Sequence, residues 1–198
     1  MQPLSNIRTA AAVGLTGIAV FSICWICAVV SDSSWIFGVN MISDLGVSDT
    51  NAHYFFNYGC MSAGILIYIY GILAAYFSGS TLDRISYVLI ALAGMFLIGV
   101  GTFTEDVGWP HNLCAYSLFI SISISALIRL ILYVIYKNTL SAVVTAVLIL
   151  LIVVIALTQT FPFLEASAVI LIMIWIALNC LISILEIKKE DFESKVPT

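Results

Sequence analysis

Two histidines and several carboxylates are the side chains of this sequence best suited to chemistry. His53 and His111 are the chain's two histidines, and acids lie a few residues away from each. An imidazole beside a carboxylate commonly serves as a general base, and two imidazoles with carboxylates suit Zn²⁺, Mn²⁺ or Fe²⁺. The predicted catalytic residues are Asp44, His53 and His111, and the predicted ligands of a divalent metal cofactor are His53, His111, Glu105 and Asp106.

Neighbouring polar residues extend this candidate site. Asn57 follows His53 by one helical turn, and the stretch 104–112 is the most polar part of the chain. The predicted binding residues are Ser43, Asn57, Trp109 and Asn112. No compact metal motif such as H-E-x-x-H is present, so helix capping by the same side chains stays the alternative.

Composition identifies the surroundings in which these residues must work. Of the 198 residues, 62% are hydrophobic and 9% are charged, whereas a soluble domain is about half apolar and a quarter charged. A soluble globule, a disordered chain and a basic nucleic-acid binder are therefore excluded. We expect an integral membrane protein that has membrane lipids, and no nucleic acid, as partners.

Six apolar stretches have the length of about 20 residues that a helix needs to cross a bilayer. Runs such as 143–157 are apolar on every face, which excludes the alternation of a β-barrel. The sequence predicts an all-α integral membrane protein, a single bundle of six transmembrane helices that forms one domain over residues 1–198. The predicted spans are 9–31, 54–77, 85–103, 112–136, 140–160 and 164–187.

The basic residues predict the orientation of the bundle. Every Lys and Arg outside the spans falls on one side of the predicted membrane, at Arg8, Arg84, Lys137, Lys188, Lys189 and Lys195. The positive-inside rule then places both the N and C termini in the cytoplasm, in a multi-pass protein of the cell membrane. We expect Arg129, which lies inside the fourth span, to snorkel to this same side.

The first outer loop, from about Asp32 to His53, is much longer than the other connections. Loops of this length in a compact domain are usually functional. Its many apolar residues predict a lid that folds back over the mouth of the bundle. Within it, Ser43 and Asp44 are expected to bond a following amide, and Gly46 to adopt an unusual backbone angle.

Small residues in the second and third spans are typical of close helix contacts. Gly59, Gly64, Gly94, Gly99 and Gly101 predict such faces, through which we expect homo-oligomerisation. Cys60 and Cys114 lie at similar depths, and a disulfide between them is left open.

Several motifs resemble a known family. They are Ile42-Ser43-Asp44-Leu45-Gly46, then Phe56-Asn57 in the second span, and Phe103 with the acidic turn and His111-Asn112. In these the chain is similar to the prokaryotic six-span membrane family known as domain of unknown function 998. The first turn is also distantly similar to that of the Frag1/DRAM/Sfk1 proteins, although Leu45 stands where those commonly have Thr. The resemblance implies a shared six-span fold and, from the second group, lipid handling.

Three functions remain open at this point. The first is a polar, lidded site at the extracytoplasmic mouth that binds or modifies a lipid headgroup, with or without a metal. The second is a non-enzymatic membrane scaffold or assembly partner, in which the same residues cap helices. The third is a small-solute transporter, which the scarcity of charge in the middle of the spans disfavours.

Overall fold

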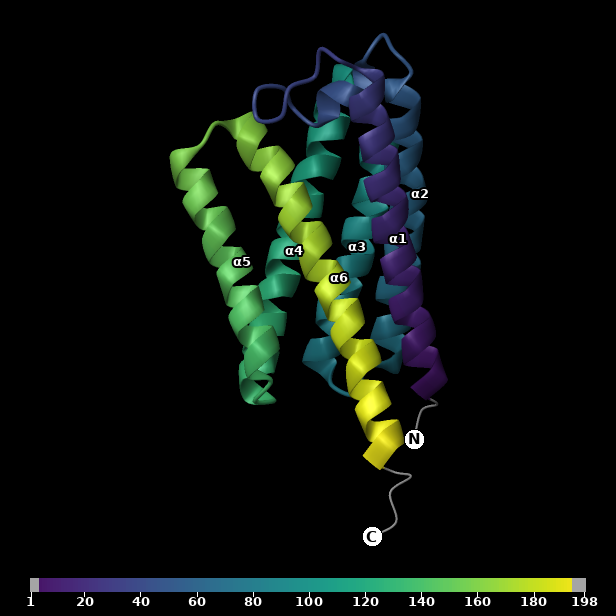
Figure 1. The fold of residues 1–198 in the computed structure, drawn as a ribbon, viewed down its shortest axis with the longest axis vertical. Helices are drawn as coiled ribbons and strands as arrows, with labels where there is room; N and C mark the ends of the chain where they lie inside the picture. Colours follow the sequence, from purple (N-terminus) through teal and green to yellow (C-terminus); the bar gives the residue numbers. More distant parts are fainter. Residues whose placement is uncertain (1–3, 194–198) are drawn as a thin grey trace.

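The computed structural model describes residues 4–193 of the chain, and describes side chains over residues 7–184. Within this range the chain forms six long helices and two short 3-10 turns, and no strand (Figure 1). The helices are α1 (Leu4–Ser31), α2 (Ala52–Phe77), α3 (Thr81–Thr102), α4 (Trp109–Ile135), α5 (Thr139–Thr158) and α6 (Phe161–Glu193), and the turns are η1 (Ser43–Val47) and η2 (Glu105–Val107).

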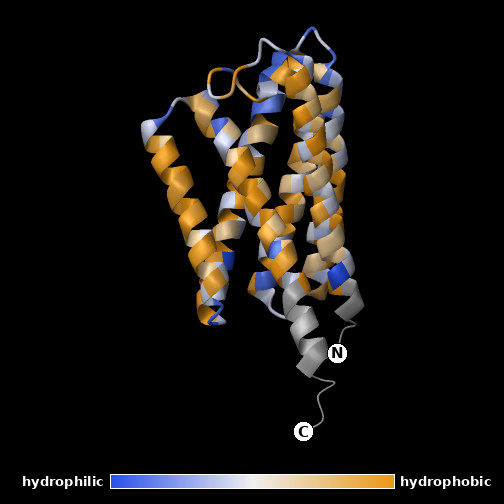
Figure 2. Ribbon diagram, in the orientation of Figure 1, coloured by the Kyte–Doolittle hydropathy of each residue, from blue (hydrophilic) through white to orange (hydrophobic). Residues whose placement is uncertain are grey.

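All six helices are long and apolar enough to cross a membrane, which confirms the six predicted spans. Figure 2 shows apolar residues along the length of the bundle, most uniformly on α5. The helices start between one and five residues before the predicted spans, and at two of these starts a polar residue just before the helix caps it. Ser80 accepts a hydrogen bond from the Asp83 amide, and Asn138 accepts one from the Ser141 amide.

The two ends of the bundle differ in charge. The start of α1, the α2–α3 turn and the α4–α5 turn lie at one end, which we call the basic end because it carries Arg8, Arg84 and Lys137. The opposite end carries the first loop, η2 and the α5–α6 turn (Figure 1). We call it the acidic end, because no Lys or Arg within residues 4–193 lies there, and it holds Asp32, Asp44, Asp49, Glu105, Asp106 and Glu165.

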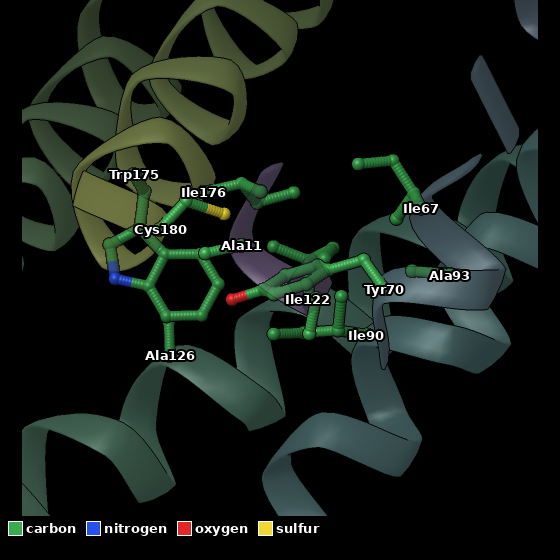
Figure 3. Close-up of a cluster of buried hydrophobic side chains, with 11 residues drawn as sticks. Ala11, Ile67, Tyr70, Ile90, Ala93, Ile122, Ala126, Trp175, Ile176 and Cys180 are labelled. Carbon is green, nitrogen blue, oxygen red and sulfur yellow. The ribbon is translucent and has the colours of Figure 1, made fainter. Parts of the chain in front are cut away.

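The core lies between α1, α2, α3, α4 and α6. Tyr70 points from α2 toward Trp175 and Cys180 of α6 (Figure 3), and all three side chains are buried. Helix α5 packs mainly against α4 and α6, and its buried residues are Ser141 and Thr145. Most of α5 is therefore left for lipid to cover.

Glycine permits the tight contact between α2 and α3. A Cβ atom added to Gly94 would lie 2.5 Å from the backbone nitrogen of Tyr68, and one added to Gly64 would lie 2.7 Å from the Gly94 carbonyl oxygen. Added Cβ atoms at the three other predicted glycines would also meet atoms of neighbouring helices. Within one chain these glycines already contact neighbouring helices, and an oligomer formed through them stays a prediction.

The Arg129 guanidinium is buried between helices, and the predicted snorkelling to solvent is wrong. Its Nη1 atom lies 3.0 Å from a carboxylate oxygen of Asp83 on α3. Its central carbon lies 4.7 Å from the ring centre of Tyr87 and 4.9 Å from that of Tyr133. The Tyr133 hydroxyl donates in turn to Asn179 of α6. This pairing offsets the cost of burying a charge, and so makes the long reach to water unnecessary.

All five cysteines are free thiols. The disulfide that the sequence left open between Cys60 and Cys114 is therefore not formed. Both residues have packing roles instead, since a Cβ atom at Gly101 would meet Cys60, and one at Gly99 would meet Cys114.

We predict that Gly94→Ala destabilises the fold by about 1–3 kcal/mol, because α2 and α3 must separate to admit the methyl group. Gly79→Ala is the matched control, since an added Cβ there has nothing within 4 Å. The control should change the free energy of unfolding by less than about 0.5 kcal/mol. Denaturant unfolding of the purified proteins in one detergent measures both changes, and equal effects would contradict the contact.

Candidate functional site at the acidic end

The first loop, residues 32–51, forms a lid over the acidic end, as predicted. The Thr160 hydroxyl donates to the carbonyl of Gly38 at 3.2 Å, and the Phe37 ring packs edge-on against Phe163 at 5.4 Å between centres. These contacts hold the middle of the lid on the start of α6. Hydrogen bonds from Ser34 and Ser48 close the base of the lid on Asp32, and they lower the pKa of that carboxyl.

The turn η1 anchors the lid in the bundle. Ile42 and Leu45 are 4% and 0% exposed and pack among apolar residues of α1 and α2. The Asn57 side chain donates to the Gly46 carbonyl at 2.9 Å, and a Cβ at Gly46 would lie 2.7 Å from the Asn57 carbonyl oxygen. Glycine is therefore needed here because there is no room for a side chain, and not because the backbone angle is unusual. Asn57, a predicted binding residue, serves to position the turn.

Asp44 closes the turn in the reverse sense to that predicted. Its Oδ2 atom accepts a hydrogen bond from the amide of Met41, which precedes it, at 2.9 Å. Ile42 follows Met41, and its amide points away from Asp44, toward α6. There it donates to an oxygen of Glu165 at 2.7 Å.

Glu165 is the central acid of the site, and the sequence prediction of site residues missed it. It lies one turn into α6 and is 8% exposed. Oε2 accepts from the Ile42 amide, and Oε1 lies 3.4 Å from the Ser43 hydroxyl. Its position in the sequence, a charge just inside an apolar span, is the signal that could have identified it.

Glu105 brings a second carboxyl to the same place. It lies beside Ser43 and Asp44, close enough to His111 and Glu165 for electrostatic interaction. Burial raises the pKa of Glu105, and the charge of Asp44 raises it further, while Ser43 and His111 oppose the rise. The Oε2 atom of Glu105 is buried and has no hydrogen-bond partner among the described residues.

The two histidines have different surroundings. His111 is 4% exposed, and its Nδ1 atom bonds the Phe103 carbonyl at 2.7 Å. A carbonyl only accepts, so Nδ1 carries a proton, and Nε2 is an acceptor when the ring is neutral and a donor when it is charged. Nδ1 of His53 is directed to the carbonyls of Ser48 and Thr50, which lie five and three residues before it. His53 therefore closes the start of α2, whereas His111 belongs to the site.

The predicted metal ligands are not arranged as a metal site. Within the part of the chain that the structure describes, no three His, Cys, Asp or Glu side chains are grouped to hold an ion. Asp106 is exposed and accepts from the Thr104 hydroxyl at 2.5 Å. Trp109 is 74% exposed at the start of α4, where aromatic residues commonly meet the membrane interface.

A cavity of about 530 Å³ lies below these groups, between α4, α5 and α6; we call it the lateral cavity. Its volume is in the usual range for ligand sites, about 300–1,000 Å³. Its walls are mostly apolar, and at the acidic end it reaches five polar residues. These are Ser43, Glu105, His111, Asn112 and Glu165.

The fold and this cavity define the class of the protein as a multi-pass, all-helical membrane protein with a lidded cavity among its last three helices. The chain belongs to the family described as proteins of unknown function (DUF998), which it matches over residues 15–182. This confirms the first resemblance seen in the sequence. No curated protein and no solved structure matches the chain.

We predict that Asp44→Ala frees the Met41 amide and speeds its hydrogen exchange by about tenfold, because the amide loses a charged acceptor. Asp49→Ala is the control, since Asp49 is an exposed acid of the same loop. Exchange measured by mass spectrometry on lid peptides tests this. Equal exchange rates in the two variants would contradict the assignment of Asp44 as the acceptor that holds the turn.

The contribution of Glu105 to stability should fall as the pH rises above about 4.3, the ordinary pKa of glutamate, because the pKa of this carboxyl is raised in the folded protein. In this window the folded state binds more protons than the unfolded state, so raising the pH favours unfolding. Glu105→Gln should flatten this dependence, while Asp106→Asn, at an exposed acid, should keep it. Thermal unfolding across the pH range measures the slopes, and an unchanged slope in Glu105→Gln would contradict the assignment.

Proposed function

We propose that the protein binds a lipid-like amphiphile in the lateral cavity, with the polar head at the acidic end and the chain between α4, α5 and α6. The observation that carries this proposal is the polarity of the cavity. Buried Glu165 and His111 lie at one end of it, and its walls continue as apolar side chains to Trp175. An elongated cavity that changes from polar to apolar is complementary to an amphiphile.

Access from the membrane supports the proposal. Tyr116 and Leu127 of α4, Val153 of α5 and Phe161 of α6 all line the cavity and are about half exposed. Their surroundings in a membrane are lipid, so the cavity is open toward the bilayer. The lid covers the acidic end, where Met41 and Ser43 contribute to the cavity wall. The ligand would therefore enter sideways from the bilayer.

The opposite end of the cavity favours binding over transport. There the Trp175 indole donates to the Thr145 hydroxyl at 3.3 Å, and both residues are buried. The buried network of Arg129, Tyr133 and Asn179 continues from this point toward the basic end. A transporter would need a polar path through this region, which is closed by packed and bonded side chains.

The orientation of the bundle and the role of His111 are further parts of this proposal. By the positive-inside rule, the acidic end would face outward from the cell membrane and the ligand would come from the outer leaflet. In its neutral form, with Nε2 free of a proton, His111 would serve as a base if the ligand is also modified. The likeness of the η1 turn to the Frag1/DRAM/Sfk1 proteins agrees with lipid handling, and the proposal does not depend on it.

We predict that Ala168→Phe, which fills the cavity from α6, weakens amphiphile binding by at least about tenfold, because the ring takes the space of the chain. Ala146→Phe on α5 is the control, since Ala146 is exposed and outside the cavity. Native mass spectrometry of protein released from detergent measures retained lipid. Equal retention in the two variants would refute the cavity as the binding site and favour the scaffold.

A further inference from the structure

We propose that the ligand of the lateral cavity is a long-chain amine, a single-chain amphiphile whose protonated amino group lies between Glu165 and Glu105. The inference rests on the proposed function and names its ligand class. It follows from the charge of the acidic end, the free acceptor atoms there, and the apolar walls of the cavity.

Charge complementarity selects a cation. Two carboxyl groups, Glu105 and Glu165, line the head of the cavity, and Asp44 lies within electrostatic range of both. No Lys or Arg side chain in residues 7–184 lies at this end to balance them. Like charges brought together in a partly buried place repel, and a cation between them removes that repulsion. A phosphate or sulfate head would add to the repulsion.

The acceptor atoms left free suit an ammonium group. Glu105 Oε2 is buried and unpaired among the described residues, and Glu165 Oε1 has one long contact, with Ser43. His111 lines the same end, and in the neutral ring its Nε2 atom is a further acceptor, because Nδ1 donates to the Phe103 carbonyl. A primary ammonium has three donors and no acceptor, so it can satisfy such a group of atoms.

The rest of the cavity accounts for the chain. Below the acids its walls are apolar residues such as Ile122, Leu148 and Ile172, which favour a hydrocarbon chain over a soluble amine. A phospholipid with an amino head is a poorer match, because its phosphate would enter the carboxyl cluster beside the amine. The site therefore fits an amphiphile with net positive charge.

The test is a comparison of three probes with the same 16-carbon chain: hexadecylamine, hexadecanol and hexadecanoate. Their binding to the full-length protein in detergent is measured by native mass spectrometry at neutral pH. We expect the amine to bind at least about tenfold more tightly than the alcohol, the value of one charge-assisted hydrogen bond, and the carboxylate to bind most weakly.

Substitutions of the two glutamates test whether these acids cause the preference for the amine. Glu105→Gln and Glu165→Gln should each narrow the ratio of amine to alcohol affinity, whereas Asp49→Asn, an exposed acid of the lid, should leave it unchanged. Glu105→Gln provides the answer if Glu165→Gln fails to fold, because Glu105 makes no bond to the Ile42 amide. A ratio that stays at the wild-type value in a folded Glu105→Gln or Glu165→Gln would overturn the assignment.

The outcomes separate this inference from the proposed function. If the amine and the alcohol bind equally, and both bind more weakly to Ala168→Phe, the amine class is overturned and the cavity remains an amphiphile site. Failure of all three probes to bind would refute both proposals. Phosphatidylethanolamine that competes as well as hexadecylamine would overturn the requirement for net positive charge.

Discussion

The hydrogen bond from the Ile42 amide to the Glu165 carboxylate joins two parts of the chain that are 123 residues apart. It brings the first loop onto the last helix, and so places Ser43 and Asp44 beside Glu105 and above the lateral cavity. The bond also gives a buried carboxylate an amide donor, without which its burial would be costly. This one contact therefore joins the lid, the acidic cluster and the head of the cavity.

The acids and the cavity are more informative together than apart. A cluster of carboxylates at a helix end is ordinary, and an apolar gap beside an outlying helix would fill with lipid. Here the two features are continuous, since Glu165 and Glu105 line the same cavity as Trp175. A scaffold needs neither a buried acid with spare acceptors nor an opening toward the bilayer, and so the arrangement favours ligand binding.

The six spans and the lid could be predicted from sequence, because hydrophobic length and loop length are local properties. The pairing of Ser43 with Glu165 could not, since nothing in the sequence indicates which helix start receives the loop. His53 was predicted as a site residue from its type alone, and the contacts of its Nδ1 atom with the Ser48 and Thr50 carbonyls could not be foreseen in the same way. Arg129 was misjudged because its partner, Asp83, lies 46 residues away on another helix.

The buried position of Arg129 bears on how the chain enters its membrane. A lone arginine inside a transmembrane helix raises the cost of insertion, by about 2.5–3.5 kcal/mol at the centre and by less toward an end, where Arg129 lies six residues before the last residue of α4. Its ion-pair partner Asp83 and the ring of Tyr87 lie on α3, which the ribosome completes before α4. The charge therefore meets a waiting carboxylate as α4 leaves the translocon, and α3 and α4 are suited to integrate as a hairpin. Asn179, on the last helix, joins the network when the bundle closes.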